Sequence, residues 1–278
     1  MGETSETLRQ WQETAAFWAE HRNTISRMFS PLTRALIEQA RIREGDTVLD
    51  IAGGTGEPSL TIAEAVRPGG SVTCTDAVEE MVETAEQEAR SRGLTNIQFR
   101  QCSAEALPFP DDTFDVVVSR LGAMFFPEEA FREILRVTKP AGTIAFAVWC
   151  DSALNPFCHL ATEVMSRHVE SPAPDPNAPG AFRFAEEGKL AGILKEAGAT
   201  DLHECIFKFN IAAPLSPTEF WQMRSSISET LRTKLASLSV TERSQIATEI
   251  EVAVKEFFPD NQMKFPTQML IVSGRKPN

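Results

Sequence analysis

The sequence predicts an α/β protein built on one doubly wound, mostly parallel seven-stranded sheet. Three observations carry this prediction. Short apolar runs alternate with helical patterns, a glycine-rich turn follows the first of these runs, and the alternation resumes after an interruption. The chain has 278 residues, 42% of them hydrophobic and 24% charged, which is typical of a globular protein long enough to bury a substantial core.

The first 44 residues predict helices. Apolar residues recur at spacings of three and four over residues 8–22 and again over 25–40. Pro31 falls inside the second pattern and predicts a break or a first helical turn there. We therefore expect residues 1–44 to form N-terminal helices that are part of a lid.

From Thr47 the pattern becomes one of short β-rich runs separated by helices, which predicts parallel βαβ units. Gly69, Gly93 and the run Pro140-Ala141-Gly142 separate the elements. Residues 45–150 are thus expected to form the cofactor-binding core. Its predicted strands are 47–51, 71–75, 96–100, 114–119 and 142–149, and its predicted helices are 57–66, 78–92 and 128–138.

Residues 151–278 are expected to complete the sheet and to carry two cap insertions, 151–185 and 213–262. The proline-rich stretch 171–180 predicts an exposed loop. The remaining predicted elements are a helix over 186–196, a strand over 202–211, a helical block over 218–258 and a last strand over 267–274.

The net charge and the cysteine content disfavour several classes of binding partner and site. A net charge of −12 disfavours nucleic acid and anionic lipid surfaces. No apolar leader opens the chain and no apolar run approaches the ~18 residues of a membrane span, so we expect a cytoplasmic protein without membrane insertion. Five cysteines without a C-x-x-C pair predict neither a disulfide framework nor a metal site. The oligomeric state is not determined by these features.

The strongest site signal is VLDIAGGTGEPSL at 48–60, where a strand leads through a glycine turn into a helix. Its G-x-G-x-x-S spacing is an incomplete dinucleotide fingerprint, with Asp76 near the position of a ribose-binding acid, so an NAD-type oxidoreductase is one alternative. Asp50 and Glu57 flank the turn, and their charge favours a cationic ligand such as S-adenosylmethionine over a pyrophosphate.

Four motifs in order resemble the class I S-adenosylmethionine-dependent methyltransferases, within them the ubiquinone/menaquinone C-methyltransferase-like branch. The resemblance implies a Rossmann-like fold, S-adenosylmethionine as cofactor and methyl transfer to a small molecule as activity. The motifs are DIAGGTG at 50–56, TDAVEEMVETA at 75–85, SAEALPFPDDTFDVVVS at 103–119 and EILRVTKPAG at 133–142.

The resemblance also implies roles for individual residues. Asp50, Gly54 and Gly56 would line the methionine end of the cofactor, and Asp76 would accept both ribose hydroxyls. Ala52 stands where the family has its first glycine, which is tolerable if its φ is negative. The full set of expected cofactor residues is Asp50, Ala52, Gly53, Gly54, Gly56, Asp76, Ala77, Met81, Ser103, Ala104, Glu105 and Ser119.

Ser103 replaces the acid that usually meets the adenine amino group in this family. A hydroxyl can also accept that hydrogen bond, and Glu105 is an alternative contact. The sequence leaves open which of the two residues contacts the adenine.

The substrate is expected beyond the fourth strand, where residues 119–127 reach the carboxyl edge of the sheet. The expected pocket residues are Arg120, Met124, Phe125, Phe126, Trp149, Trp221 and Arg224. Arg120 would bind an anionic substrate group or pair with an acid on the N-terminal helices. Among the histidines, only His159 is a candidate general base, and no other catalytic residue is identified.

A phenol- or quinone-like ring and a small amine both fit an apolar, capped pocket, so the substrate and the methylated atom stay open. Besides the oxidoreductase, the other alternative is a non-catalytic cofactor-binding protein of the same fold.

Overall fold

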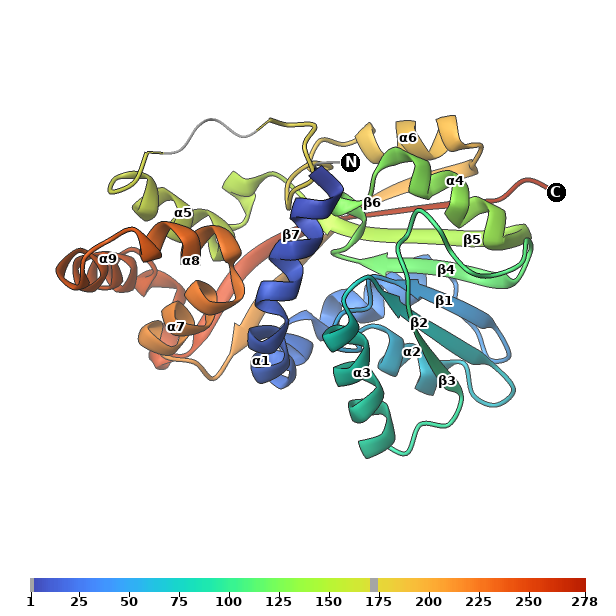
Figure 1. Cartoon of the computed structure of the whole chain (residues 1–278), viewed down its shortest axis with the longest axis horizontal. Coiled ribbons are helices and arrows are strands. Elements are labelled where there is room, and N and C mark those ends of the chain that lie inside the picture. The colour runs from blue at the N-terminus through green and yellow to red at the C-terminus, as the bar shows by residue number, and fades with distance from the viewer. Residues whose placement is uncertain (1–2, 171–174) are drawn as a thin grey trace.

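The computed structural model describes residues 3–170 and 175–278. Within them the strands form one seven-stranded sheet in the order β3-β2-β1-β4-β5-β7-β6. β7 runs antiparallel to both of its neighbours, and the remaining pairings are parallel (Figure 1). The strands are β1 (Thr47–Ile51), β2 (Ser71–Asp76), β3 (Ile97–Gln101), β4 (Phe114–Arg120), β5 (Thr138–Trp149), β6 (Thr200–Ala213) and β7 (Met263–Arg275).

This sheet confirms the predicted fold class. β1 lies near the middle of the sheet between β2 and β4, and its Val48 and Leu49 are fully buried, as expected for a parallel strand covered on both faces. The helices are α1 (Glu3–Gln39), α2 (Ser59–Ala65), α3 (Glu79–Ser91), α4 (Glu128–Val137), α5 (Pro156–Ser166), α6 (Lys189–Ala197), α7 (Pro217–Ile227), α8 (Glu229–Ala236) and α9 (Val240–Ala253).

α1 corrects the prediction of two N-terminal helices, because it is one helix that continues through Pro31. A proline in a helix leaves the carbonyl four residues earlier without its N–H partner. Here that carbonyl belongs to Arg27, and it accepts a hydrogen bond from the Ser30 hydroxyl at 3.1 Å. The C-terminal half of α1 enters the main core through Leu32 and Leu36. Its N-terminal half therefore extends from a firmly held base.

β5 begins at Thr138, four residues earlier than predicted, and includes the run Pro140-Ala141-Gly142 that was expected to end the preceding element. The pairing with β4 shifts register between Phe114 and Val116, so the run is accommodated as an irregularity of the strand.

The predicted helical block 218–258 consists of α7, α8 and α9 rather than one continuous helix. Ser228 accepts the N–H of Leu231, and Ser239 forms a capping box with Glu242, so each serine starts a new helix. In Figure 1 these helices and α5 gather at one end of the molecule, with α1 beside them. Phe265 of β7 contacts Phe157 of α5 and Phe220 of α7, which ties the group to the sheet.

The proline-rich stretch falls partly outside the described residues, since 171–174 are not among them. Over the described ranges, no helix combines the length and the apolar character that crossing a membrane requires.

Candidate active site

A cavity of about 200 Å³ lies at the carboxyl edge of the parallel strands, where the sequence places the cofactor. Three parts of the chain line it: the glycine turn with the ends of β2 and β3, the exit of β4, and α1. The lining residues are Thr7, Leu8, Trp11, Trp18, Ile25, Phe29, Ile51–Thr55, Glu57, Asp76–Val78, Met81, Cys102–Glu105, Arg120–Gly122 and Phe125–Pro127.

The glycine turn approaches its neighbours so closely that side chains are excluded. A Cβ at Gly53 would lie 2.6 Å from the Cys74 sulfur and 3.0 Å from an Asp50 carboxylate oxygen. Gly54 has a φ of +55°, and a Cβ there would meet nothing within 4 Å, because the residue borders the cavity. The turn thus presents bare backbone to a ligand.

Ala52 does not meet the condition under which the sequence makes it tolerable in place of glycine, a negative φ. Its φ is +57°, in the left-handed region that disfavours residues with a Cβ. The residue nevertheless fits, because a glycine lies opposite it. A Cβ added at Gly122 would lie only 2.6 Å from the Ala52 Cβ.

Asp50 is fully buried behind the turn and does not line the cavity. Its Oδ2 accepts hydrogen bonds from the Ser59 N–H at 3.1 Å and the Ser59 hydroxyl at 2.6 Å, while Oδ1 has no partner. Burial raises the pKa of Asp50 to about 7, against the lowering effects of Ser59 and Arg120. Because the Asp50 carboxylate accepts the first N–H of α2, Asp50 holds the glycine turn against this helix.

Asp76 ends β2 and faces the cavity. Its Oδ2 accepts the Gly54 N–H at 2.9 Å and its Oδ1 the Val78 N–H at 3.0 Å. Burial raises the pKa of this carboxyl, and the backbone N–H groups oppose that shift. A carboxylate has about four acceptor positions, so each oxygen can still accept a hydroxyl from a ligand.

Beyond Asp76 the cavity wall contains further residues that the sequence assigns to the cofactor. Ala77, Met81, Ser103, Ala104 and Glu105 all line it. The Ser103 hydroxyl accepts the Glu105 N–H at 3.3 Å, so the two candidate adenine contacts are neighbours on one turn.

The N-terminal half of α1 forms the opposite wall, and the sequence analysis named none of its residues as site residues. Trp11 packs edge-on against Phe125 with ring centroids 5.2 Å apart. Leu8, Trp11 and Trp18 also pack against Val78 and Met81 in a small cluster separate from the main core. The signal for this wall was the pattern Leu8, Trp11, Ala15, Trp18, an apolar stripe with two tryptophans at helical spacing.

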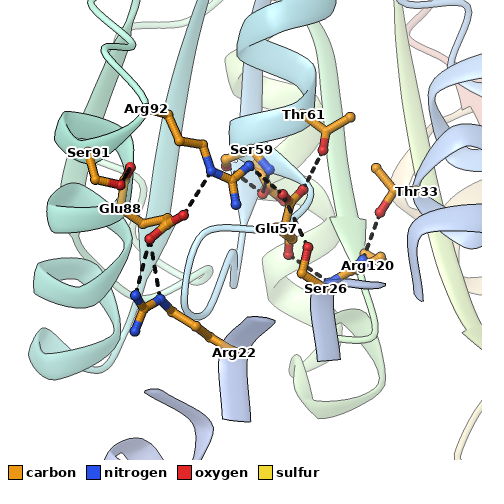
Figure 2. Close-up of polar contacts among 11 residues, drawn as sticks. Arg22, Ser26, Thr33, Glu57, Ser59, Thr61, Glu88, Ser91, Arg92 and Arg120 are labelled. Atoms are coloured by element: carbon orange, nitrogen blue, oxygen red, sulfur yellow. Dashed lines mark hydrogen bonds and ion pairs between the residues drawn. The ribbon is translucent and has the colours of Figure 1, made fainter. Parts of the chain in front are cut away.

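Arg120 extends from the end of β4 into a polar network under α1 (Figure 2). One terminal nitrogen donates to the Thr33 hydroxyl at 2.7 Å and the other to the Glu57 carbonyl at 3.1 Å. The sequence allowed an acid on the N-terminal helices as its partner, but the partner there is a hydroxyl. Burial lowers the pKa of Arg120, while the carboxylates of Glu57 and Asp50 oppose that shift, and a guanidinium stays charged.

The Glu57 carboxylate is occupied by other residues in the same network. It pairs with Arg92, the residue that follows α3, at 3.0 Å and accepts the Thr61 hydroxyl at 2.7 Å. Arg92 also pairs with Glu88, which in turn meets Arg22 of α1 at 3.3 Å (Figure 2). Asp50 is buried and Glu57 is paired. The two acids therefore do not form the exposed negative surface that the sequence predicted would favour a cationic ligand over a pyrophosphate.

Several expected site residues do not line the cavity. Gly56 has a structural position, since a Cβ there would lie 2.7 Å from Leu60. Trp149 packs edge-on against Phe29, and Arg224 lies 4.7 Å above the Phe157 ring, so both belong to the packing between the helical group and the sheet. Absent from the lining are Asp50, Gly56, Ser119, Met124, Trp149, His159, Trp221 and Arg224.

His159 is half-exposed on α5, with its Nε2 3.4 Å from Glu163. This places the only histidine candidate for a general base away from the cavity. More broadly, the cavity lining contains no residue of 151–185 or 213–262 within the described part of the chain. The wall that those insertions were expected to supply comes from α1.

A mostly parallel sheet with this strand order, a glycine turn after β1 and an acid at the end of β2 are typical of nucleoside-cofactor-binding proteins of the doubly wound class. Comparison with known proteins gives the family. Residues 42–198, more than half of the chain, match the family model described as "Methyltransferase domain". The chain belongs to this methyltransferase family, which confirms the family resemblance identified in the sequence.

Curated relatives match part of the chain. A protein of Mycobacterium tuberculosis is 38% identical over 138 residues, which cover 48% of this chain and 49% of the relative. The ubiquinone/menaquinone biosynthesis C-methyltransferase UbiE of Ectopseudomonas mendocina is 41% identical over 114 residues, covering 40% of this chain and 44% of the relative. The chain spans about half the length of the curated relatives it matches.

Solved structures share the fold. The YcgJ protein of Bacillus subtilis superposes with a TM-score of 0.58 at 22% identity, covering 90% of this chain and 99% of that one. Phosphoethanolamine N-methyltransferase 2 of Haemonchus contortus, solved with S-adenosylmethionine, superposes with a TM-score of 0.57 at 16% identity. The match covers 98% of this chain and 60% of that one. At these identities the likeness concerns the fold alone.

Proposed function

We propose that this protein transfers the methyl group of S-adenosylmethionine to a small, largely apolar molecule with a phenol- or quinol-like ring. The observation that carries the proposal is the composition of the cavity. One side has the bare glycine turn and Asp76, and the other has aromatic side chains of α1 and of the segment after β4. The UbiE-named relatives favour a ring over an amine as the acceptor.

The residues present fit the cofactor. The open space over Gly54 admits a ligand to the backbone, and both Asp76 oxygens can accept one more hydrogen bond each. When bound, the cofactor supplies the methyl group as electrophile together with its leaving group. The protein then has to place the acceptor atom in line with that methyl and exclude water.

Trp11, Phe125 and Phe126 are placed for both tasks. They line the cavity with apolar rings, and Trp11 reaches Phe125 across it from α1. A flat aromatic acceptor between such rings gains contact area and loses few rotamers, because the rings themselves have little freedom. The orientation of the acceptor is thus supplied by packing, and no histidine among the lining residues is needed for it.

Asp76→Ala tests the cofactor assignment. Loss of two hydrogen bonds to a carboxylate, at ~1.5–3 kcal/mol each, should weaken S-adenosylhomocysteine binding by about a hundredfold or more in calorimetry. Asp115→Ala is the matched control. Asp115 is also a carboxylate at a strand end, but it accepts the Thr47 N–H and pairs with Lys139 at the opposite edge of the sheet. Equal affinity in parent and Asp76→Ala would remove the assignment.

Turnover is tested with S-adenosylmethionine and panels of phenols, quinols and amines, with mass spectrometry of the methylated products. Formation of S-adenosylhomocysteine together with a methylated ring is the expected result. Tight cofactor binding without turnover on any panel would instead favour the non-catalytic alternative, and tighter binding of NAD than of S-adenosylhomocysteine would favour the oxidoreductase.

A further inference from the structure

Arg120 is half-buried, and its guanidinium carries a charge that no acid neutralises by contact. Within the described residues, no carboxylate oxygen lies within 4.0 Å of it, and its two hydrogen bonds go to the neutral oxygens of Thr33 and Glu57. Its Nε is buried without any hydrogen-bond partner. A partly desolvated cation that lacks a counter-charge gains from an anionic partner.

The acids closest to Arg120 are held by other groups. Glu57 is paired with Arg92 and hydrogen-bonded by Thr61, and Asp50 accepts both of its hydrogen bonds from Ser59. Neither carboxylate can turn toward Arg120 without giving up these contacts. The unpaired positive charge therefore remains available to a ligand in the cavity that Arg120 lines.

The donor geometry selects the kind of anion. A guanidinium has five N–H donors in one plane, and only two are used here, so each of the two terminal nitrogens keeps one N–H, and together these can offer a pair of donors. Such a pair matches the two oxygens of a carboxylate. The surroundings of Arg120 are apolar on one side, where its guanidinium lies 5.8 Å from the Phe29 ring centroid.

We propose that Arg120 is a carboxylate receptor in the wall of the cavity. The proposal rests on the function proposed above and deepens it. Two ligands can bring this group: the cofactor, through the α-carboxylate of its methionine part, or an acceptor that is an aromatic acid. In either case the carboxylate fixes the position of its carrier relative to the aromatic wall.

Calorimetry on the full chain with two pairs of probes separates the sources. The first pair is S-adenosylhomocysteine and S-adenosyl-3-thiopropylamine, which lacks only the carboxylate. The second pair, measured on protein saturated with S-adenosylhomocysteine, is 4-hydroxybenzoate and the neutral 4-hydroxybenzamide. The variants are Arg120→Gln, which keeps a donor for Thr33, and Arg120→Lys, which keeps the positive charge but lacks the paired N–H donors of the guanidinium.

Arg224→Gln is the matched control. Arg224 also has a buried Nε without a partner and also lies over a phenyl ring, that of Phe157, but it does not line the cavity. Thermal unfolding of all variants shows whether they are folded.

We expect Arg120→Gln to lower the affinity for the carboxylate-bearing probe of one pair by about tenfold or more. The affinity for the probe of that pair without the carboxylate should stay unchanged. Arg120→Lys should lie between the parent and Arg120→Gln, and Arg224→Gln should match the parent. An effect in the first pair assigns the carboxylate to the cofactor, and one in the second pair assigns it to the acceptor. Equal affinities of parent and Arg120→Gln for all four probes overturn the proposal. If the parent itself binds no S-adenosylhomocysteine, it is the proposed function that fails.

Discussion

Gly54→Ala isolates the contact between the glycine turn and the cofactor. The position has a φ of +55°, and the added Cβ meets no protein atom within 4 Å. The fold can therefore accept the methyl group at the cost of backbone strain alone, about 1–2 kcal/mol for a residue with a Cβ in the left-handed region. The methyl enters the space where the cofactor is expected to approach the backbone.

The expected loss of binding is larger than this strain. A cofactor displaced from the turn also leaves Asp76, whose side chain lies against the same residue through the Gly54 N–H. Two charge-assisted hydrogen bonds, at ~1.5–3 kcal/mol each, amount to a loss of about a hundredfold or more in affinity. The parent and the variant should thus differ strongly in binding and only modestly in stability.

Gly93→Ala separates the two effects. Gly93 has a φ of +67°, and a Cβ there also meets nothing within 4 Å, but the residue follows α3 and does not line the cavity. Both variants should lose similar free energy of unfolding in urea titrations, and only Gly54→Ala should lose affinity for S-adenosylhomocysteine in calorimetry. Equal affinities of the two variants would refute the view that the turn touches the cofactor.

Two further substitutions test the strained and the buried parts of the turn. Ala52→Gly should raise the free energy of unfolding by up to about 1 kcal/mol, because relief of the positive φ exceeds the added entropy of the unfolded chain; a loss of more than 1 kcal/mol in urea titrations would contradict this. Asp50 has a pKa raised to about 7 by burial, so the folded state binds its proton more tightly than the unfolded state does, and this group contributes stability as the pH falls from about 7 toward 4. Asp50→Asn should remove that contribution, at most about 4 kcal/mol at ~1.4 kcal/mol per pKa unit, and identical pH profiles of unfolding for the two proteins would contradict the burial argument.

Much of the fold could be predicted because its signals are local. Each parallel strand is a short apolar run between turn residues, and β1 and β4 match their predicted starts at Thr47 and Phe114. The two N-terminal helices were predicted wrongly, since a proline signals a break and the sequence does not show that Ser30 satisfies the carbonyl left free. The positive φ of Ala52 was likewise hidden, because it depends on a glycine seventy residues later, Gly122.

The cavity was predictable on one side and not on the other. The residues of the glycine turn and of Asp76 carry recognisable spacing, whereas the opposite wall depends on how α1 packs against the sheet. Trp221 and Arg224 have the composition of a pocket wall but belong to the helical group, where Trp221 is buried and Arg224 lies over the Phe157 ring. An apolar stripe in a sequence indicates burial and does not tell which surface it covers.

The antiparallel pairing of β6 with β7 has a consequence for the length of the segment between these two strands. Ala213 lies opposite Met263, so the segment carrying α7, α8 and α9 leaves and re-enters the sheet at adjacent positions. A segment whose ends already meet can lengthen or shorten with only a slow, logarithmic change in closure entropy, and the strand register below it is unaffected. The family model ends at residue 198, before this segment begins. Closure entropy therefore places little constraint on the length of this segment, which lies outside the part of the chain that the family model covers.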